Sequence, residues 1–425
     1  MGVAADRGTP LSTEPELVTT TLSNGVRVVT EAMPGARSVA VGCWVGVGNR
    51  DEPAELAGAS HFLEHLLFKG SPRWGARELA AAVDRTGGDL NAFTTKEYTA
   101  YHAWVPAADV GLAVDVLTDV VRRPAFGRTE VDNERDVILE ELLFNEDQPE
   151  DVAATAMHEA LFPGHSLGWE VLGTHESIAA MSDDDIHRFH QRWYGPANLV
   201  FAAAGHVDHD RLVAGVVEAF GDLDAGPRPE RSSPPDDTAT PPLIERAGEQ
   251  THLAIGWRGL GHDDSDRYAM AVANQIVGGG LSSRLFQEVR ERRGLVYSVY
   301  SAVGAYADSG TFSVHAGTAN NRVAELLDVV DREIDELLAR GITETELDVA
   351  RGGFEGATVL GLEDASSRMV RLATGLTVRD RVTSVEESLA AIRAVTVDDV
   401  HRVLRRVLGR PRVLAAVGAV ASLAA

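Results

Sequence analysis

The sequence has almost no cysteine, since Cys43 is the only one among 425 residues. An intrachain disulfide is therefore impossible, and a zinc site built from several cysteines is excluded. Any tightly bound metal must be held by histidine and carboxylate side chains. The chain also has no apolar run close to the ~18 residues that a membrane helix needs, so we expect no membrane-spanning segment.

Positive charge is scarce as well. The chain has 39 basic and 64 acidic residues, a net charge of −25, and its only lysines are Lys69 and Lys96. A surface this acidic argues against nucleic acid or an anionic membrane as a partner. Residues 1–16 lack both the apolar core of a signal peptide and the arginine-rich character of a transit peptide, so we expect a short lead-in to a cytoplasmic protein.

The length and composition predict two globular domains. Hydrophobic residues make up 44% of the chain and charged residues 24%, which is typical of a folded water-soluble protein. A chain of this length exceeds the usual size of one hydrophobic core. Six prolines lie among polar residues near its middle. We therefore predict a first domain of residues 1–223, a linker of residues 224–242 and a second domain of residues 243–425.

Strand and helix patterns follow one another in the same order in both halves. Runs rich in valine and threonine indicate strands, and a Ser-Asn-Gly turn between the first two predicts a hairpin. The expected strands are 17–22, 26–30, 38–45, 89–94, 98–105, 198–204, 251–257, 296–303 and 311–316. The expected helices include 59–69, 76–86, 106–122, 129–144, 208–220, 266–276 and 282–292.

One short segment carries the clearest chemical signal, the order His61-Phe62-Leu63-Glu64-His65 within the helix predicted over 59–69. His61 and His65 are four residues apart and therefore lie on one side of that helix. Two imidazoles so placed can bind one Zn²⁺, and a carboxylate between them can accept a proton from water. The alternative is two core histidines and a solvated glutamate, but the order His-x-x-Glu-His is that of the inverted zincin signature, in which the glutamate stays off the metal.

A catalytic zinc site needs a third protein ligand, and the helix predicted over 129–144 offers Glu130, Glu134, Glu140 and Glu141. Glu134 and Glu141 are two turns apart and share a face, whereas Glu140 is rotated from Glu141 by about 100°. One of the first two can bind the metal while the other supports a ligand from behind. Periodicity alone does not choose between them, and all of them can also be ordinary solvated charges.

The two halves show a weak internal repeat. Residues 98–119 line up with 310–331 at an offset of 212, and a nearby pair lines up at an offset of 216. At the second offset the two histidines and the glutamate of the motif correspond to residues that cannot bind zinc, namely Val277, Gly280 and Leu281. If the halves are copies, only the first is catalytic.

These segments together resemble the pitrilysin/insulinase family of zinc metallopeptidases, which includes the mitochondrial processing peptidases. The motif from His61 to His65 and the segment Asn133 to Glu141 carry the resemblance. Glu141 is 76 positions after His65, which matches the family's spacing to its third ligand. The similarity extends from about Thr19 to Val417. Further matching segments are Gly88-Asp89-Leu90-Asn91-Ala92-Phe93-Thr94, Leu172-Gly173-Thr174, Tyr194-Gly195-Pro196-Ala197-Asn198 and Gly278-Gly279-Gly280-Leu281-Ser282-Ser283-Arg284-Leu285.

The resemblance implies the roles of five residues in the first half. His61, His65 and Glu141 would bind one Zn²⁺ per chain. Glu64 would be the catalytic base that activates water, and Glu134 would support the site.

The resemblance also implies how a substrate is held. Arg290 and Tyr297, seven residues apart, match a pair through which the family contacts the substrate carbonyl and the oxyanion, a role suited to fixed hydrogen-bond donors. Residues Asn91, Ala92 and Phe93 would belong to an exposed edge strand to which an extended peptide can add. As an alternative, Asn91 is simply a turn residue.

The family implies an α+β fold with two homologous domains, each a mainly antiparallel sheet with helices packed on one side. It implies a zinc-dependent endopeptidase acting on peptides or unfolded segments, with two chains paired so that Arg290 and Tyr297 of one chain reach the metal site of the other. Because both sets of residues are present here, we expect a homodimer. The alternatives are a dedicated processing protease that acts with another chain and a non-catalytic peptide-binding or structural partner subunit.

Overall fold

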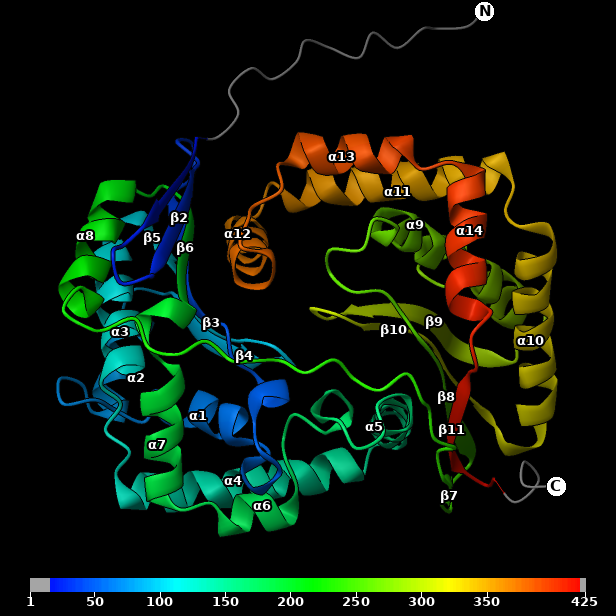
Figure 1. Ribbon diagram of the computed structural model, residues 1–425, viewed down its shortest axis with the longest axis horizontal. Helices are drawn as coiled ribbons and strands as arrows, with labels where there is room; N and C mark the ends of the chain where they lie inside the picture. The colour runs from blue at the N-terminus through cyan, green and yellow to red at the C-terminus, as the bar shows by residue number, and fades with distance from the viewer. Residues whose placement is uncertain (1–15, 421–425) are drawn as a thin grey trace, which may run out of the picture.

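The chain folds around two β-sheets, one in each half, with helices packed on and around them (Figure 1). This computed structural model describes residues 16–420, so the expected lead-in of residues 1–16 lies almost wholly outside the described residues. The mixed α+β class with two sheets agrees with the prediction from the sequence. Within residues 16–420, none of the helices combines the length and apolar character needed to cross a membrane.

The first sheet has six strands in the order β1-β2-β6-β3-β5-β4. All neighbours are antiparallel except β2 and β6, which run parallel. Strand β4 is therefore an edge strand, as the sequence predicted. The strands are β1 Leu17–Thr21, β2 Arg27–Ala32, β3 Ser38–Val45, β4 Asp89–Thr94, β5 Thr99–Pro106 and β6 Leu199–Gly205.

The second sheet repeats this topology with five strands in the order β7-β11-β8-β10-β9. Strands β7 and β11 run parallel and the other neighbours antiparallel, so β7-β11-β8-β10-β9 corresponds strand for strand to β2-β6-β3-β5-β4. The shared order supports the internal repeat that the sequence showed only weakly. The strands are β7 Leu243–Glu245, β8 Gln250–Arg258, β9 Val296–Ala305, β10 Gly310–Ala319 and β11 Val413–Gly418.

Most helices of each half cover one face of that half's sheet, and their apolar sides form its main core. The helices of the first half are α1 Ala59–Leu67, α2 Ala76–Asp84, α3 Val110–Arg122, α4 Arg128–Glu146, α5 Pro149–Leu161, α6 His175–Ala180, α7 Asp183–Trp193 and α8 His209–Phe220. Those of the second half are α9 Arg267–Val277, α10 Val323–Arg340, α11 Glu344–Gly361, α12 Ala365–Arg379, α13 Val385–Ala394 and α14 Val397–Leu408.

Each sheet is covered on its other face by one helix from the opposite half, which the sequence did not predict. Helix α12 packs on β2, β3 and β6, and α5 packs on β8 and β11 (Figure 1). Small residues allow this close approach: a side chain at Gly256 would meet Met157 of α5 at 2.6 Å. The exchange fastens the two halves together, because each half lends a helix to the other's core.

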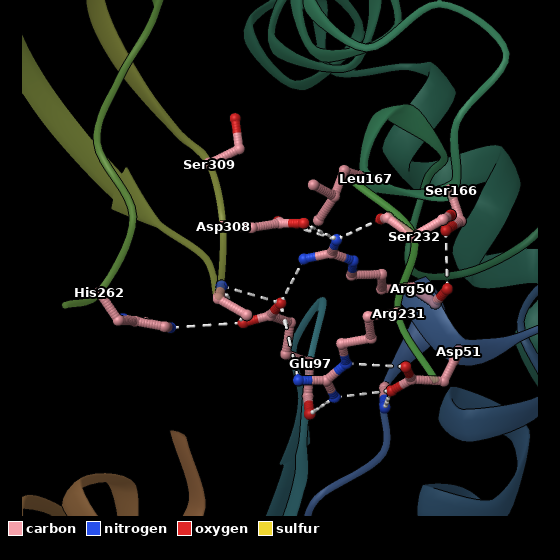
Figure 2. A network of polar contacts seen from close by, with 12 residues as sticks. Arg50, Asp51, Glu97, Ser166, Leu167, Arg231, Ser232, His262, Asp308 and Ser309 are labelled. Carbon is pink, nitrogen blue, oxygen red and sulfur yellow. Dashed lines mark hydrogen bonds and ion pairs between the residues drawn. The ribbon is translucent and has the colours of Figure 1, made fainter. Parts of the chain in front are cut away.

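The proline-rich segment runs between the halves without helix or strand from residue 221 to 242. It is fastened by Arg231, which forms an ion pair with Asp51 at 2.8 Å. Figure 2 shows that this contact belongs to a network centred on Arg50 and Glu97. The domain boundary at 224–242 stays a prediction. Helices α5 and α12 each pack on the sheet of the opposite half, so the two cores do not separate cleanly at this segment.

One predicted helix has an unusual form. Residues Phe286–Glu291, within the helix expected over 282–292, adopt a π-helix rather than a regular α-helix. Such wide turns are rare and often occur at functional sites. This one carries Arg290, the residue expected to contact substrate.

Candidate metal centre

Helix α1 is held by its N-terminal end. Gly58 takes a positive φ of 90°, which favours glycine, and the chain turns there into the helix. The buried carboxylate of Glu52 accepts hydrogen bonds from the backbone N–H groups of Gly58 at 2.7 Å and Ser60 at 2.6 Å. Burial raises the pKa of Glu52 to about 7. The helix that carries both histidines is therefore fixed at its first turn by a side chain that no sequence motif had singled out.

Helices α1 and α4 bring His61, His65 and Glu141 together. One ligand atom from each lies within 4.8 Å of the others. Glu141 Oε2 is 3.6 Å from His61 Nε2 and 3.5 Å from His65 Nε2. A tetrahedral zinc ion with ligands at about 2.0–2.1 Å separates its ligand atoms by roughly 3.3 Å. The spacing of these three side-chain atoms therefore fits one zinc ion held by His61, His65 and Glu141.

The lowered pKa of His61, unlike the raised pKa of His65, suits a metal ligand. Burial, and then the neighbouring charge of His65, lower the pKa of His61 to about 4, so its imidazole is neutral at pH 7 and free to be a ligand. Burial opposes protonation of His65 too, but its contacts with Glu141 and Glu134 outweigh burial and raise its pKa. The contact with His65 is the main reason that the pKa of Glu141 is lowered.

Glu134 lies behind His65, on the same face of α4 as Glu141. Its Oε2 is 3.1 Å from Nδ1 of His65, which leaves Nε2 directed at Glu141. Its Oε1 is 2.6 Å from the ammonium of Lys69. Glu140 is exposed on another face. Of the two glutamates that periodicity left open, the structure places Glu141 with the histidines and Glu134 in support.

Glu64 lies on α1 beside the edge strand β4. Its Oε2 accepts a hydrogen bond of 2.5 Å from the hydroxyl of Thr94, the last residue of β4. Burial raises the pKa of Glu64, and this hydrogen bond opposes the rise. Asn91 of the same strand is exposed, and Ala92 and Phe93 are half-buried. Their proposed contacts with substrate stay predictions.

Arg290 and Tyr297 lie together in the second half. The Arg290 guanidinium stands 5.3 Å from the centre of the Tyr297 ring, and Tyr297 is 83% exposed. Within residues 16–420, no hydrogen bond or ion pair joins either of them to the His61, His65 and Glu141 group. Tyr297 is thus exposed and Arg290 partly exposed, and neither is joined to the His61, His65 and Glu141 group of its own chain.

Three supporting residues were missed from the sequence, namely Glu52, Lys69 and Thr94. Lys69 follows His65 by four residues, a helical spacing that pointed toward the same face. Thr94 ends the quoted segment that contains Asn91. Glu52 gave no comparable signal. It lies six residues before Gly58, the first residue whose N–H it accepts, so the contact depends on the path of the loop between them.

The chain is similar to known proteins over most of its length. The family model described as Insulinase (Peptidase family M16) matches residues 27–175, and the model described as Peptidase M16 inactive domain matches residues 180–354. An uncharacterized zinc protease of Mycobacterium tuberculosis is 47% identical over 396 residues, which cover 92% of this chain and 90% of the relative. The chain belongs to the insulinase family, peptidase family M16.

Other M16 relatives are similar over the same length. An uncharacterized zinc protease of Bacillus subtilis is 36% identical, covering 93% of this chain and 96% of the relative. A solved protease from Helicobacter pylori superposes with a TM-score of 0.86 at 22% identity and covers 95% of this chain and 99% of that one. A structure from Pseudomonas fluorescens described as a peptidase M16 inactive domain has the same TM-score and identity. These two structures establish the fold alone.

Proposed function

We propose that this M16 chain is a zinc-dependent endopeptidase that hydrolyses peptides or unfolded protein segments. The observation that carries the proposal is the convergence of His61, His65 and Glu141 within 4.8 Å, with Glu64 beside them on α1. The names of the relatives, which are zinc proteases, agree with it. We infer one Zn²⁺ per chain, bound by these two histidines and Glu141.

When bound, a zinc ion lowers the pKa of water and polarises a peptide carbonyl. Glu64 accepts the proton of the attacking water at a carboxylate oxygen as the new carbon–oxygen bond forms. It then donates that proton to the amide nitrogen, which leaves as an amine when the carbon–nitrogen bond breaks. Glu134 keeps His65 in the orientation that directs Nε2 at the ligand group.

The substrate would lie extended along β4. Its main chain can pair with the free edge of that strand, which gives affinity that depends little on sequence. Asn91, Ala92 and Phe93 would contact it. Because Arg290 and Tyr297 make no contact with their own metal group, we infer that a second copy of the chain supplies them to hold the substrate carbonyl and the developing oxyanion.

This arrangement defines a homodimer with two shared sites, which we propose acts in the cytoplasm. The peptide substrate is its expected partner, and the acidic composition does not favour nucleic acid or anionic membranes. The alternative of a non-catalytic subunit is disfavoured, because the chain has His61, His65 and Glu141 grouped together with Glu64 beside them. A dedicated processing protease remains the closest alternative, and the peptides that the enzyme cleaves distinguish the two.

The test is digestion of a mixed peptide library by the purified full chain, with and without a chelator, read by mass spectrometry. We expect cleavage at many sites that the chelator abolishes and added Zn²⁺ restores. Glu64→Gln should keep the metal but lose cleavage by at least about 100-fold, since it removes the proton acceptor. Glu55→Gln, an exposed glutamate shortly before α1, is the matched control and should cleave normally. A Glu64→Gln protein as active as the wild type would refute the mechanism, and cleavage of a single peptide would favour a processing protease.

A further inference from the structure

The hydroxyl of Thr94 is the only described hydrogen-bond partner of the Glu64 carboxylate. The bond joins two elements that are distant in sequence, since Glu64 belongs to α1 and Thr94 to β4. At 2.5 Å it is short, as expected for a hydroxyl that donates to an ionised carboxylate. The bond occupies Oε2, and no hydrogen bond to Oε1 is made within residues 16–420.

A glutamate that serves as a base needs this kind of restraint. Its side chain has three rotatable bonds, and holding them in one conformation costs up to about 2 kcal/mol of entropy. A proton acceptor must also lie within about 2.6–3.2 Å of the proton it takes. A hydrogen bond to one oxygen fixes the carboxylate and leaves the other oxygen free for the proton.

The strand itself does not depend on this hydroxyl. Thr94 pairs through its backbone with Thr99 of β5, and the whole of β4 follows the same register from Asp89 to Thr94. A side chain of the same branched shape without the hydroxyl, such as valine, suits a strand equally well. The Thr94 hydroxyl can therefore be removed while β4 stays paired.

The position of Thr94 links substrate to base. The same edge strand that would pair with an extended peptide ends in the residue that holds Glu64. A peptide ordered along β4 would thus be placed relative to the carboxylate by a single rigid strand.

We propose that Thr94 is a positioning residue, whose hydroxyl holds the Glu64 carboxylate in the orientation required for proton transfer to and from a peptide on β4. This inference rests on the proposed function of Glu64 as the base. It assigns the hydroxyl to the chemical step and not to the binding of metal or peptide.

The experiment compares Thr94→Val and Thr94→Ser in the full-length zinc-loaded protein. Thr94→Val removes a hydrogen bond to a charged group, and we expect this loss to lower kcat about 10- to 100-fold with KM unchanged. Thr94→Ser keeps the hydroxyl and should retain kcat within about threefold of the wild type. Thr86→Val is the control, because the Thr86 hydroxyl bonds only backbone groups ahead of β4.

Two measurements that do not depend on turnover accompany the kinetics. Zinc content should equal that of the wild type. Peptide affinity, measured in a Glu64→Gln background so that the peptide survives, should be the same with and without Thr94→Val. A crystal structure of Thr94→Val should show the Glu64 side chain in a new or mixed orientation with β4 intact.

The outcomes separate this inference from the proposed function. If the wild type cleaves and Thr94→Val has the same kcat, the positioning role is refuted while the peptidase survives. A rise in KM at constant kcat, or a loss in Thr94→Ser as large as in Thr94→Val, would also refute it. If the wild type cleaves no peptide, or Glu64→Gln cleaves like the wild type, the proposed function itself fails.

Discussion

Glu97 lies at the junction of the two halves and is the most informative residue to perturb for stability (Figure 2). Its carboxylate is 2.7 Å from Arg50 and accepts hydrogen bonds of 3.0 and 3.1 Å from the backbone N–H of Ala307. His262 lies 3.3 Å away and Arg231, from the linker, 3.6 Å away. The partners come from the first half, the linker and the second half, so Glu97→Gln should weaken the contact among all three.

Two lines of reasoning give the magnitude. Burial opposes ionisation of Glu97, but its contacts with His262, Arg231, Ala307 and Arg50 together lower its pKa from 4.5 to about 2. That difference corresponds to about 3 kcal/mol of stability at neutral pH. The side chains of Glu97 and Arg50 are only 3% and 1% exposed. Removing one partner of a buried ion pair costs about 3–5 kcal/mol, so we expect Glu97→Gln to lose about 3 kcal/mol.

The stability lost in Glu97→Gln should become smaller as the pH falls. Because folding lowers the pKa of Glu97, its carboxylate contributes fully above about pH 4.5, and this contribution disappears as the pH falls toward 2. The free energy of unfolding can be measured by urea denaturation, followed by circular dichroism, at several pH values. Asp115→Asn is the control, because its ion pair with Arg73 is 3.1 Å long but more than half exposed on both sides, and should change stability by less than about 1 kcal/mol. A loss below about 1 kcal/mol for Glu97→Gln at pH 7, or one that stays constant down to pH 2.5, would refute this reasoning.

Two further predictions concern the shared site and its metal. Mixing inactive Glu64→Gln and Tyr297→Phe proteins under conditions that exchange subunits should restore about one quarter of wild-type activity. Half of the dimers are then hybrids, and each hybrid has one intact site. If mass measurement verifies that hybrids form and no activity returns, the result counts against sharing between chains. Glu134→Gln should weaken zinc binding about 10- to 100-fold, because His65 loses its contact with a charged carboxylate. Zinc affinity can be measured by competition with a chromogenic chelator. The control is Glu140→Gln at an exposed position, which should bind zinc like the wild type. Equal affinities of these two variants would show that Glu134 does not support the metal.

The parts of the site that the sequence predicted share a physical property, which is local geometry. His61 and His65 are fixed relative to each other by helical spacing alone, and so are Glu134 and Glu141. The edge position of β4 came instead from the resemblance to a known family. Choosing Glu141 over Glu134 as a ligand required the resemblance to a known family, since helical period places both on one face.

The parts that the sequence did not predict depend on contacts between distant segments. The hydrogen bond from Thr94 to Glu64 and the cap of α1 by Glu52 depend on how a strand and a loop pack beside α1. The exchange of α5 and α12 was equally hidden, because each helix has the ordinary apolar pattern of a buried helix. The sequence signal for this packing is the presence of small residues in the sheet, such as Gly256, which leave room for a second helix.

The exchange fixes the two halves of the chain relative to each other. Because α12 seals the first sheet and α5 the second, the two halves form a single unit whose relative position is set by buried surfaces. At the sequence offset of 216, His65 corresponds to Leu281, which is 72% exposed, so the second half does not repeat the metal-binding motif. It carries Arg290 and Tyr297, which contact each other, with Tyr297 largely exposed. In the homodimer that we propose, Arg290 and Tyr297 of one chain would complete the site of the other, and dimerisation would then be required for cleavage.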